Sequence, residues 1–254
     1  MDARKVTMKR ITIALALTVF AVGLGSCGQK TRSGDPAPYA AGWTKFETVH
    51  FVLMDPPDSP RASHVSELAD ACEDVFNQLV TVLKLQVPER IWIYRFVTNQ
   101  DCENKTGHSA GYVEGYRILT RIGAPLGGAI ALAACTSIDP GHQANAFLRN
   151  GLREAFDQQD RNVHREAATL LATDHWIPLN ECITATTVTD HQAYDVESGS
   201  FIAYLIQRHG VEKFKELWRS RQDLATALQK TCGGTIEQIS DDWIAHITRE
   251  ANKT

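Results

Sequence analysis

The spacing of apolar positions changes along this chain, from patterns typical of strands in the first half to patterns typical of helices in the second. Residues 46–54 are dense in β-branched and aromatic side chains and end at Asp55-Pro56-Pro57, which predicts a strand followed by a turn. Residues 90–98 predict a second strand, and residues 111–122 predict a third strand or a hairpin around Gly115. Between the first two strands, Ser59-Pro60 and helically spaced apolar residues up to Leu83 predict one helix.

Beyond residue 123 the pattern is helical almost to the end of the chain. Residues 124–138 are nearly all small and apolar, which indicates a helix buried on every side. Five further helices are predicted at residues 145–156, 166–171, 190–208, 211–219 and 236–247. A chain in which strands come first and helices follow is typical of the α+β class. We therefore predict an α+β fold with a small, mostly antiparallel N-terminal sheet and one helix, followed by a helical C-terminal half.

The N-terminus carries the pattern of a bacterial lipoprotein signal peptide. Basic residues precede an apolar run at residues 11–24, which is too short to span a bilayer comfortably. The run ends in Leu24-Gly25-Ser26-Cys27, which resembles the lipobox, in which the cysteine is lipidated and becomes the mature N-terminus. We therefore expect a signal peptide at residues 1–27, a flexible tether at residues 28–42 and a folded domain at residues 43–254.

Charge restricts the partners and the location. The chain has 26 basic and 30 acidic residues; removal of residues 1–27 takes away four basic residues and one acidic residue, which leaves 22 and 29 and a net charge of −7. An acidic body argues against nucleic acid as a partner. It also gives no attraction to an anionic lipid surface, so membrane attachment depends on the lipid on Cys27. Gly28 follows this cysteine in place of an acid, which resembles the default signal for the outer membrane of Gram-negative bacteria. We expect the body on its periplasmic face.

Five cysteines follow Cys27, and we expect them in an oxidising compartment. Because five is odd, at most two disulfides can form and one thiol is left over. The pairing stays open, with Cys102–Cys135 favoured because both residues flank the same short region. A thiol that stays free is more often a buried small hydrophobe than a nucleophile. The five residues are Cys72, Cys102, Cys135, Cys182 and Cys232.

Four strings, in this order, resemble the peptidase MA-like domain of the gluzincin zinc metallopeptidases. WTKFETVHFVL at residues 43–53 resembles the opening strand, and TGHSAGYVEGYRI at residues 106–118 resembles the edge-strand region before the active-site helix. FLRNGLREAF at residues 147–156 resembles the W-L-x-E-G-L-A-E-Y string of the second active-site helix. GSFIAYLIQRHGVEKF at residues 199–214 resembles the helix-Gly-helix segment that follows. Together these strings span most of residues 43–219 and imply the fold of that family.

The residues that perform the chemistry of that family are missing from the sequence. The family binds zinc with the two histidines of an HExxH helix, whose glutamate activates water, and with a glutamate from the second helix. The resemblance places that second-helix glutamate at Asn150 and the HExxH within residues 127–135, which read GGAIALAAC. An amide oxygen is a poor zinc ligand beside a carboxylate. We therefore predict a catalytically inactive domain without a cofactor.

A rearranged site offers an alternative. His142, with Asp139 before it and Glu154 after it, would make the protein a hydrolase or peptidase with a non-standard site; otherwise His142 lies in a solvated turn and Glu154 is a surface carboxylate. Ser137 and Cys135 near His142 lack the surroundings of a nucleophile. Four other histidines are not spaced as metal ligands, and we expect them at the surface: His164, His175, His191 and His246.

Aromatic residues gather on the predicted strands, where they are more often core than a binding face. They are Trp92, Tyr94, Phe96, Tyr112 and Tyr116. In the peptidase family the edge strand beside the active-site helix pairs with an extended substrate by strand addition. The resemblance therefore implies a binding or assembly role, with an extended peptide or an envelope protein as the partner.

Overall fold

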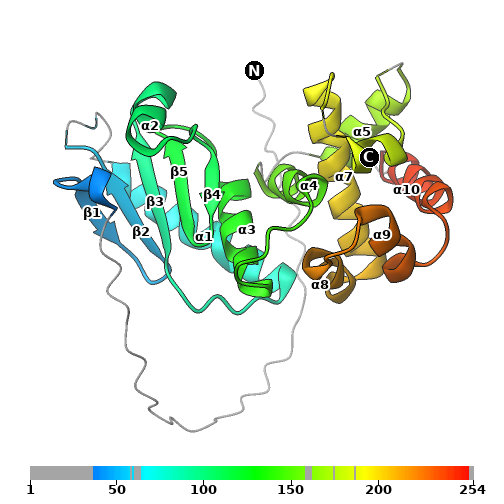
Figure 1. Ribbon diagram of the computed structural model, residues 1–254, viewed down its shortest axis with the longest axis horizontal. Helices are drawn as coiled ribbons and strands as arrows, with labels where there is room; N and C mark the ends of the chain where they lie inside the picture. Colours follow the sequence, from blue (N-terminus) through cyan, green and yellow to red (C-terminus); the bar gives the residue numbers. More distant parts are fainter. Residues whose placement is uncertain are drawn as a thin grey trace, which may run out of the picture. The chain divides into compact units, whose positions relative to one another are not determined.

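The computed structural model describes residues 37–57, 59, 64–157, 162–173, 175–185 and 187–251. Its five-stranded sheet has the order β1-β2-β3-β5-β4 (Figure 1). The strands are β1 (Thr44–Glu47), β2 (Phe51–Asp55), β3 (Ile91–Phe96), β4 (Tyr112–Glu114) and β5 (Arg117–Arg121). The three central strands, β2, β3 and β5, run parallel, and the two edge strands pair antiparallel with their neighbours. The α+β class is confirmed.

The prediction of a mostly antiparallel sheet is wrong, because the sheet is mixed. Helix α1 (Val65–Leu83) connects β2 to β3, and helix α2 (Asn99–Thr106) begins the connection from β3 towards β5. A helical connection carries the chain back to the end of the sheet where the previous strand began, so the next central strand runs parallel to it. The sequence analysis did not predict α2, whose start is capped by Thr98 and whose end is marked by Gly107 at φ 76°.

The single strand predicted at residues 46–54 is also divided into two. A tight turn separates β1 from β2, with Thr48 N–H donating to Phe51 O at 3.0 Å and Phe51 N–H donating to Thr48 Oγ1 at 3.1 Å. The two strands form an antiparallel hairpin in which Phe46 is paired with Leu53. A threonine that bonds its own turn in this way competes with continued strand geometry.

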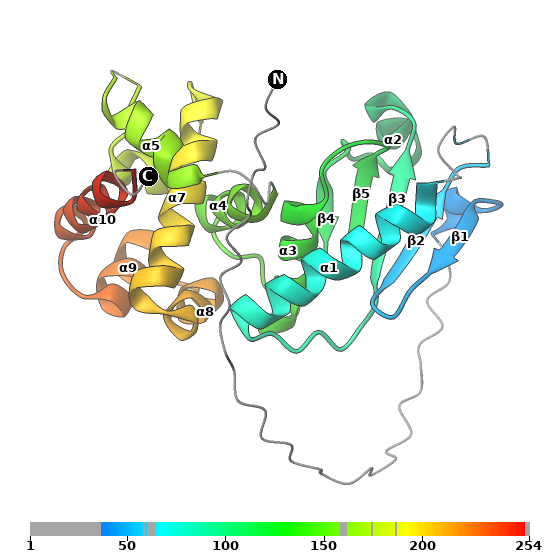
Figure 2. The same cartoon turned by 180° about the vertical axis from the view of Figure 1, so that it is seen from behind.

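Both faces of the sheet are covered, so all five residues of β2 are buried. Helices α1 and α3 (Gly127–Cys135) lie over one face, as Figure 2 shows. Helix α2 and the short helix η1 (Pro38–Ala40) contribute to the apolar cluster on the other face. Residues 37–42, assigned to the tether from sequence, are therefore part of the packed body: Ala40 is buried, and the ring of Tyr39 lies 5.3 Å from that of Tyr94.

The rest of the chain is helical. The short helix η3 (Thr136–Ile138) follows α3, and the predicted helices are present as α4 (Ala146–Asp157), α5 (Val163–Leu171), α7 (His191–His209), α8 (Val211–Arg219) and α10 (Ile236–Ala251). Helices α6 (Leu179–Thr184) and α9 (Leu224–Cys232) were not predicted. Helices α4 and α7 pack at close range because Gly151 lies between them: a Cβ there would be 2.3 Å from Ser198 O. None of the helices in the described part of the chain has the length and apolar content needed to cross a membrane.

Two expectations about single residues are corrected. His164, expected at the surface, is 6% exposed; its Nδ1 is hydrogen bonded to Ser200 Oγ at 3.0 Å, and burial lowers the pKa of His164 to about 4. The disulfide Cys102–Cys135 does not form, because Cys102 belongs to the apolar cluster on one face of the sheet and Cys135 to the cluster on the other. All five cysteines of the described residues are free thiols. The signal peptide, Cys27 and residues 28–36 lie outside the described residues.

Candidate functional site

Helix α3 occupies the place where the resemblance puts the zinc-binding helix. All its residues except Leu132 are buried. Its first turn is in direct contact with the backbone of α4, since a Cβ on Gly127 would lie 2.1 Å from Phe156 O and a Cβ on Gly128 would lie 2.4 Å from Arg153 O. These two positions therefore have no room for a side chain. The sequence GGAIALAAC is explained by close helix packing.

Asn150, which the resemblance aligns with the third ligand, is hydrogen bonded to α7. Its Nδ2 atom donates to Asp195 Oδ1 and to Ser198 Oγ, both at 2.8 Å. A glutamate at this position would bring a second carboxylate close to Asp195 and would have no N–H to donate. The amide therefore has a structural explanation: its N–H groups join α4 to α7 by hydrogen bonds, whereas a zinc ligand coordinates the metal through a lone pair.

The residues of the alternative site lie in different surroundings. His142 lies in the loop between η3 and α4 and lines a cavity of about 290 Å³. The Asp139 carboxylate lies 2.8 Å from Arg221 Nη2. Glu154 lies over α7, with its Cβ 2.8 Å from where a Cβ on Gly199 would be. Across the described residues, no three or more His, Cys, Asp or Glu side chains come together in a group that could hold a metal ion.

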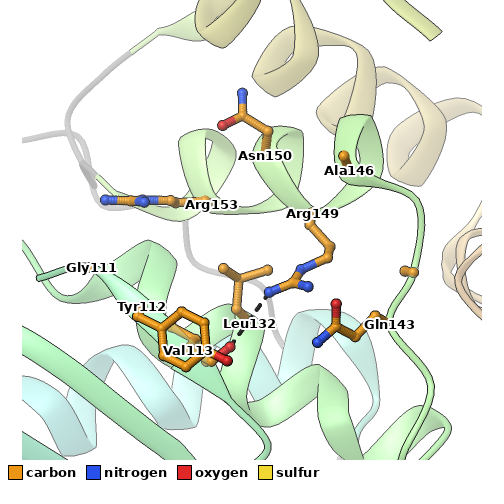
Figure 3. Close-up of a pocket in the computed structure, with 10 residues that line it drawn as sticks. Gly111, Tyr112, Val113, Leu132, Gln143, Ala146, Arg149, Asn150 and Arg153 are labelled. Carbon is orange, nitrogen blue, oxygen red and sulfur yellow. Dashed lines mark hydrogen bonds between the residues drawn. The ribbon is translucent and has the colours of Figure 1, made fainter. Parts of the chain in front are cut away.

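A cleft of about 460 Å³ lies between the edge strand β4 and helix α4 (Figure 3). Strand β4 is the last strand of the sheet, so its outer edge has no neighbouring strand. The lining residues come from the start of β4, from α3, from the loop before α4 and from α4 itself. They are Gly111, Tyr112, Val113, Leu132, Gln143, Ala144, Ala146, Arg149, Asn150 and Arg153. The cleft therefore runs beside an open strand edge.

The charge of this cleft is positive, in a chain whose net charge is −4. Arg149 and Arg153 are one helical turn apart on α4 and both line the cleft. Arg149 Nη2 donates to Val113 O on the edge strand, with a distance of 3.5 Å. Arg153 Nη2 lies 3.3 Å from where a Cβ on Gly111 would be. Among the described residues, no acidic side chain lines the cleft and neither arginine forms an ion pair.

The aromatic residues of the sheet divide between core and surface. Tyr94 and Phe96 are buried, as expected of core residues, and Trp92 stacks on Tyr94 with ring centroids 6.1 Å apart. Tyr112 lies at the cleft, where it stacks on His108 with ring centroids 3.9 Å apart. The aromatic residues therefore do not form one continuous binding face, and only Tyr112 among them lines the cleft.

The sequence analysis passed over Arg149 and Arg153. Their signal is present in the string FLRNGLREAF as two arginines four residues apart on a predicted helix, which places them on one face. The spacing alone does not show that this face meets a strand edge. Comparison with known proteins gives no match: no family model, no curated protein and no solved structure is significantly similar to the chain.

Proposed function

We propose that this protein is a cell-envelope lipoprotein, anchored through a lipid on Cys27, whose body is a catalytically inactive peptidase MA-like domain that binds an extended peptide. The peptide pairs with the outer edge of β4 and lies in the cleft between β4 and α4. The body faces the periplasm from the outer membrane of a Gram-negative bacterium. The proposal rests on the resemblance in sequence and on the surroundings of the cleft.

The observation that carries the proposal is an open strand edge beside a cleft whose lining, within the described residues, contains no His, Cys, Asp or Glu side chain. An exposed edge offers backbone N–H and C=O groups to an added strand. At the β4 edge the carbonyl of Val113 points out of the sheet, and its only hydrogen bond in that direction within the described residues is the 3.5 Å contact with Arg149. This long contact is weak and can give way to a peptide N–H. We expect the side chains that line the cleft to bind the peptide without cleaving it.

The cleft selects peptides by charge. The guanidinium groups of Arg149 and Arg153 favour carboxylates, with which they can form paired hydrogen bonds. Leu132 and Tyr112 supply an apolar floor for alternate side chains. In an added strand, successive side chains point to opposite faces. A peptide that alternates acidic and apolar residues therefore matches the cleft best.

Fluorescence polarisation with two labelled peptides tests the binding. We expect a peptide of alternating valine and glutamate to bind, and its valine and lysine counterpart to bind at least about tenfold more weakly because the arginines repel it. Methylation of the peptide nitrogens that pair with β4 is expected to abolish binding, since it removes the donors of the added strand. Binding that survives this methylation would contradict strand addition.

The matched variants are Arg153→Ala in the cleft and Arg165→Ala on α5. Both arginines are exposed and lie on helices, and only Arg153 lines the cleft. We expect Arg153→Ala to weaken binding of the glutamate peptide about tenfold and Arg165→Ala to leave it unchanged. An equal effect of both variants would show that the peptide responds to the overall charge and does not use the cleft.

Elemental mass spectrometry after dialysis against trace zinc tests the loss of catalysis. We expect no stoichiometric metal in the wild-type protein and no cleavage of the peptides during the binding assay. Stoichiometric zinc that disappears in the His142→Ala variant would overturn the proposal and support the hydrolase with a site around His142 and Glu154. Peptide binding without metal would support the proposal.

A further inference from the structure

A row of polar side chains crosses the three parallel strands on the face that α1 and α3 cover. Arg95 of β3 is in register with Thr120 of β5, and Asp55, the last residue of β2, lies on the other side of Arg95. The three residues are at most 4% exposed. On the same face, two residues closer to the start of each strand, the positions are apolar: Leu53, Ile93 and Ile118.

Much of the hydrogen-bonding capacity of this row is unused within the described residues. Arg95 Nε lies 3.3 Å from Asp55 Oδ1, but no hydrogen bond reaches Arg95 Nη1 or either carboxylate oxygen of Asp55. Thr120 Oγ1 has only a 3.4 Å contact with the carbonyl oxygen of Arg121. Buried polar atoms without partners are costly and uncommon in native proteins, so each of them calls for an explanation.

A cavity of about 640 Å³ opens beside this row, and Arg95 and Thr120 line it. It lies at the carboxyl ends of the parallel strands, which is the usual place for a ligand in sheets of this kind. Helix α1 begins after β2 and α3 begins after β5, so the N-terminal turns of both helices are near this end of the sheet. Helix N-termini carry partial positive charge. Residues 123–126 complete one wall with small and apolar side chains.

The charges around the cavity favour an anion. Arg95 and Arg121 both line it, and Asp55 does not. The acidic residue that lines it, Glu67, is on the exposed outer part and lies 3.3 Å from the ring of His64. A cation would therefore meet a buried guanidinium, whereas an oxyanion would accept hydrogen bonds that Arg95 and Thr120 do not make otherwise.

We propose that this cavity binds a small molecule through an oxyanion, a carboxylate or a phosphate, that the Arg95 guanidinium and the Thr120 hydroxyl hold. The buried Asp55 carboxylate orients Arg95 from behind. Arg121, the exposed last residue of β5, adds positive charge near the mouth. The site uses different residues from the peptide cleft, which lies along the outer edge of β4, so it does not depend on the proposed peptide binding.

Thermal unfolding of the full-length protein in Tris-chloride buffer, with inorganic phosphate or succinate as the probe, tests this site. Each probe is added at about 10 mM, and sodium chloride keeps the ionic strength constant, because a ligand that binds only the folded state raises the unfolding midpoint. We expect at least one probe to raise it. Stabilisation by phosphate alone would show that the site binds a phosphate group. Stabilisation by succinate alone would show that it binds a carboxylate group. No stabilisation by either probe would overturn the proposal.

Matched variants of strand β5 separate the site from general surface charge. Arg121→Ala removes the arginine at the cavity, and Arg117→Ala removes an exposed arginine at the other end of the same strand, about 13 Å away. We expect Thr120→Val to weaken binding of the stabilising probe about tenfold and Arg121→Ala about threefold, with Arg117→Ala unchanged. Equal losses in Arg121→Ala and Arg117→Ala, or full binding in Thr120→Val, would refute the site.

Removal of Arg95 itself needs a compensating change, because Arg95→Met leaves the Asp55 carboxylate buried without its partner and is expected to impair folding. The double variant Asp55→Asn with Arg95→Met removes both charges together. We expect it to fold and to show no stabilisation by either probe. A folded double variant that is stabilised as strongly as the wild type would contradict the role of Arg95.

Discussion

Glu197 lies in the interior of the helical half and provides a test of how burial controls charge. Its side chain, on α7, is fully buried. Oε1 accepts a hydrogen bond from Ile177 N–H at 2.9 Å, and Oε2 accepts one from Cys182 Sγ at 3.5 Å. Burial raises the pKa of Glu197 from 4.5 to about 7 in spite of these two hydrogen bonds, which act to lower it. Glu197→Gln keeps the shape and removes the titration.

The magnitude follows from the difference in pKa between the folded and unfolded states. Because the folded state binds the proton more tightly, the contribution of Glu197 to stability is fully present below about pH 4.5 and is lost as the pH rises through 7. A shift from 4.5 to about 7 corresponds to about 3 kcal/mol in total, of which about 2.5 kcal/mol falls between about pH 5 and pH 8. The Gln variant lacks this contribution.

Urea unfolding at several pH values measures the effect. The free energy of unfolding of the wild type minus that of Glu197→Gln is expected to fall by about 2.5 kcal/mol between about pH 5 and pH 8. Other groups titrate in both proteins and cancel in this difference, including His164, whose depressed pKa removes stability as the pH falls from 6.5 towards 4. The same comparison with Glu181→Gln, an exposed carboxylate on α6, should show no such fall. A difference for Glu197→Gln that stays constant with pH would refute the reasoning.

Three further results are expected. Gly151→Ala should lower the free energy of unfolding in urea by about 2 to 3 kcal/mol, because the added Cβ would lie 2.3 Å from Ser198 O and would push α4 away from α7. Asn150→Glu should not create zinc binding in elemental analysis and should destabilise the protein by about 1 to 3 kcal/mol, because it replaces the donor to Asp195 with a like charge. Alkylation without reductant, followed by mass spectrometry, should modify all five thiols from Cys72 to Cys232 in denaturant. In the native protein it should modify at most the half-buried Cys232. A Cys102–Cys135 disulfide would reduce the number modified in denaturant from five to three.

The order of elements and most helices were predictable from local patterns. The helix between the first two strands, the buried helix after residue 123 and the long helix that ends at Gly210 all have an apolar periodicity or an end signal that acts over a few residues. Helix α2 was missed because its sequence is polar, and α6 because six residues are too few to show an apolar periodicity. Helix α9 has nine residues, as many as the predicted α8, but its apolar pattern of Leu224, Ala227 and Leu228 was not recognised. The turn at Thr48 was missed because its hydrogen bonds form between residues of one apolar segment.

The sequence by itself determined the absence of an HExxH motif and the identity of Asn150. Only the tertiary structure decided what these residues do: the glycines of α3 allow two backbones to approach, and Asn150 donates to Asp195. It also placed Arg149 and Arg153 beside the edge strand β4 and Arg95 beside Asp55. The reason is physical. Helix propensity and periodicity act between near neighbours in the chain, whereas burial, strand order and the meeting of distant charges depend on how the whole chain packs.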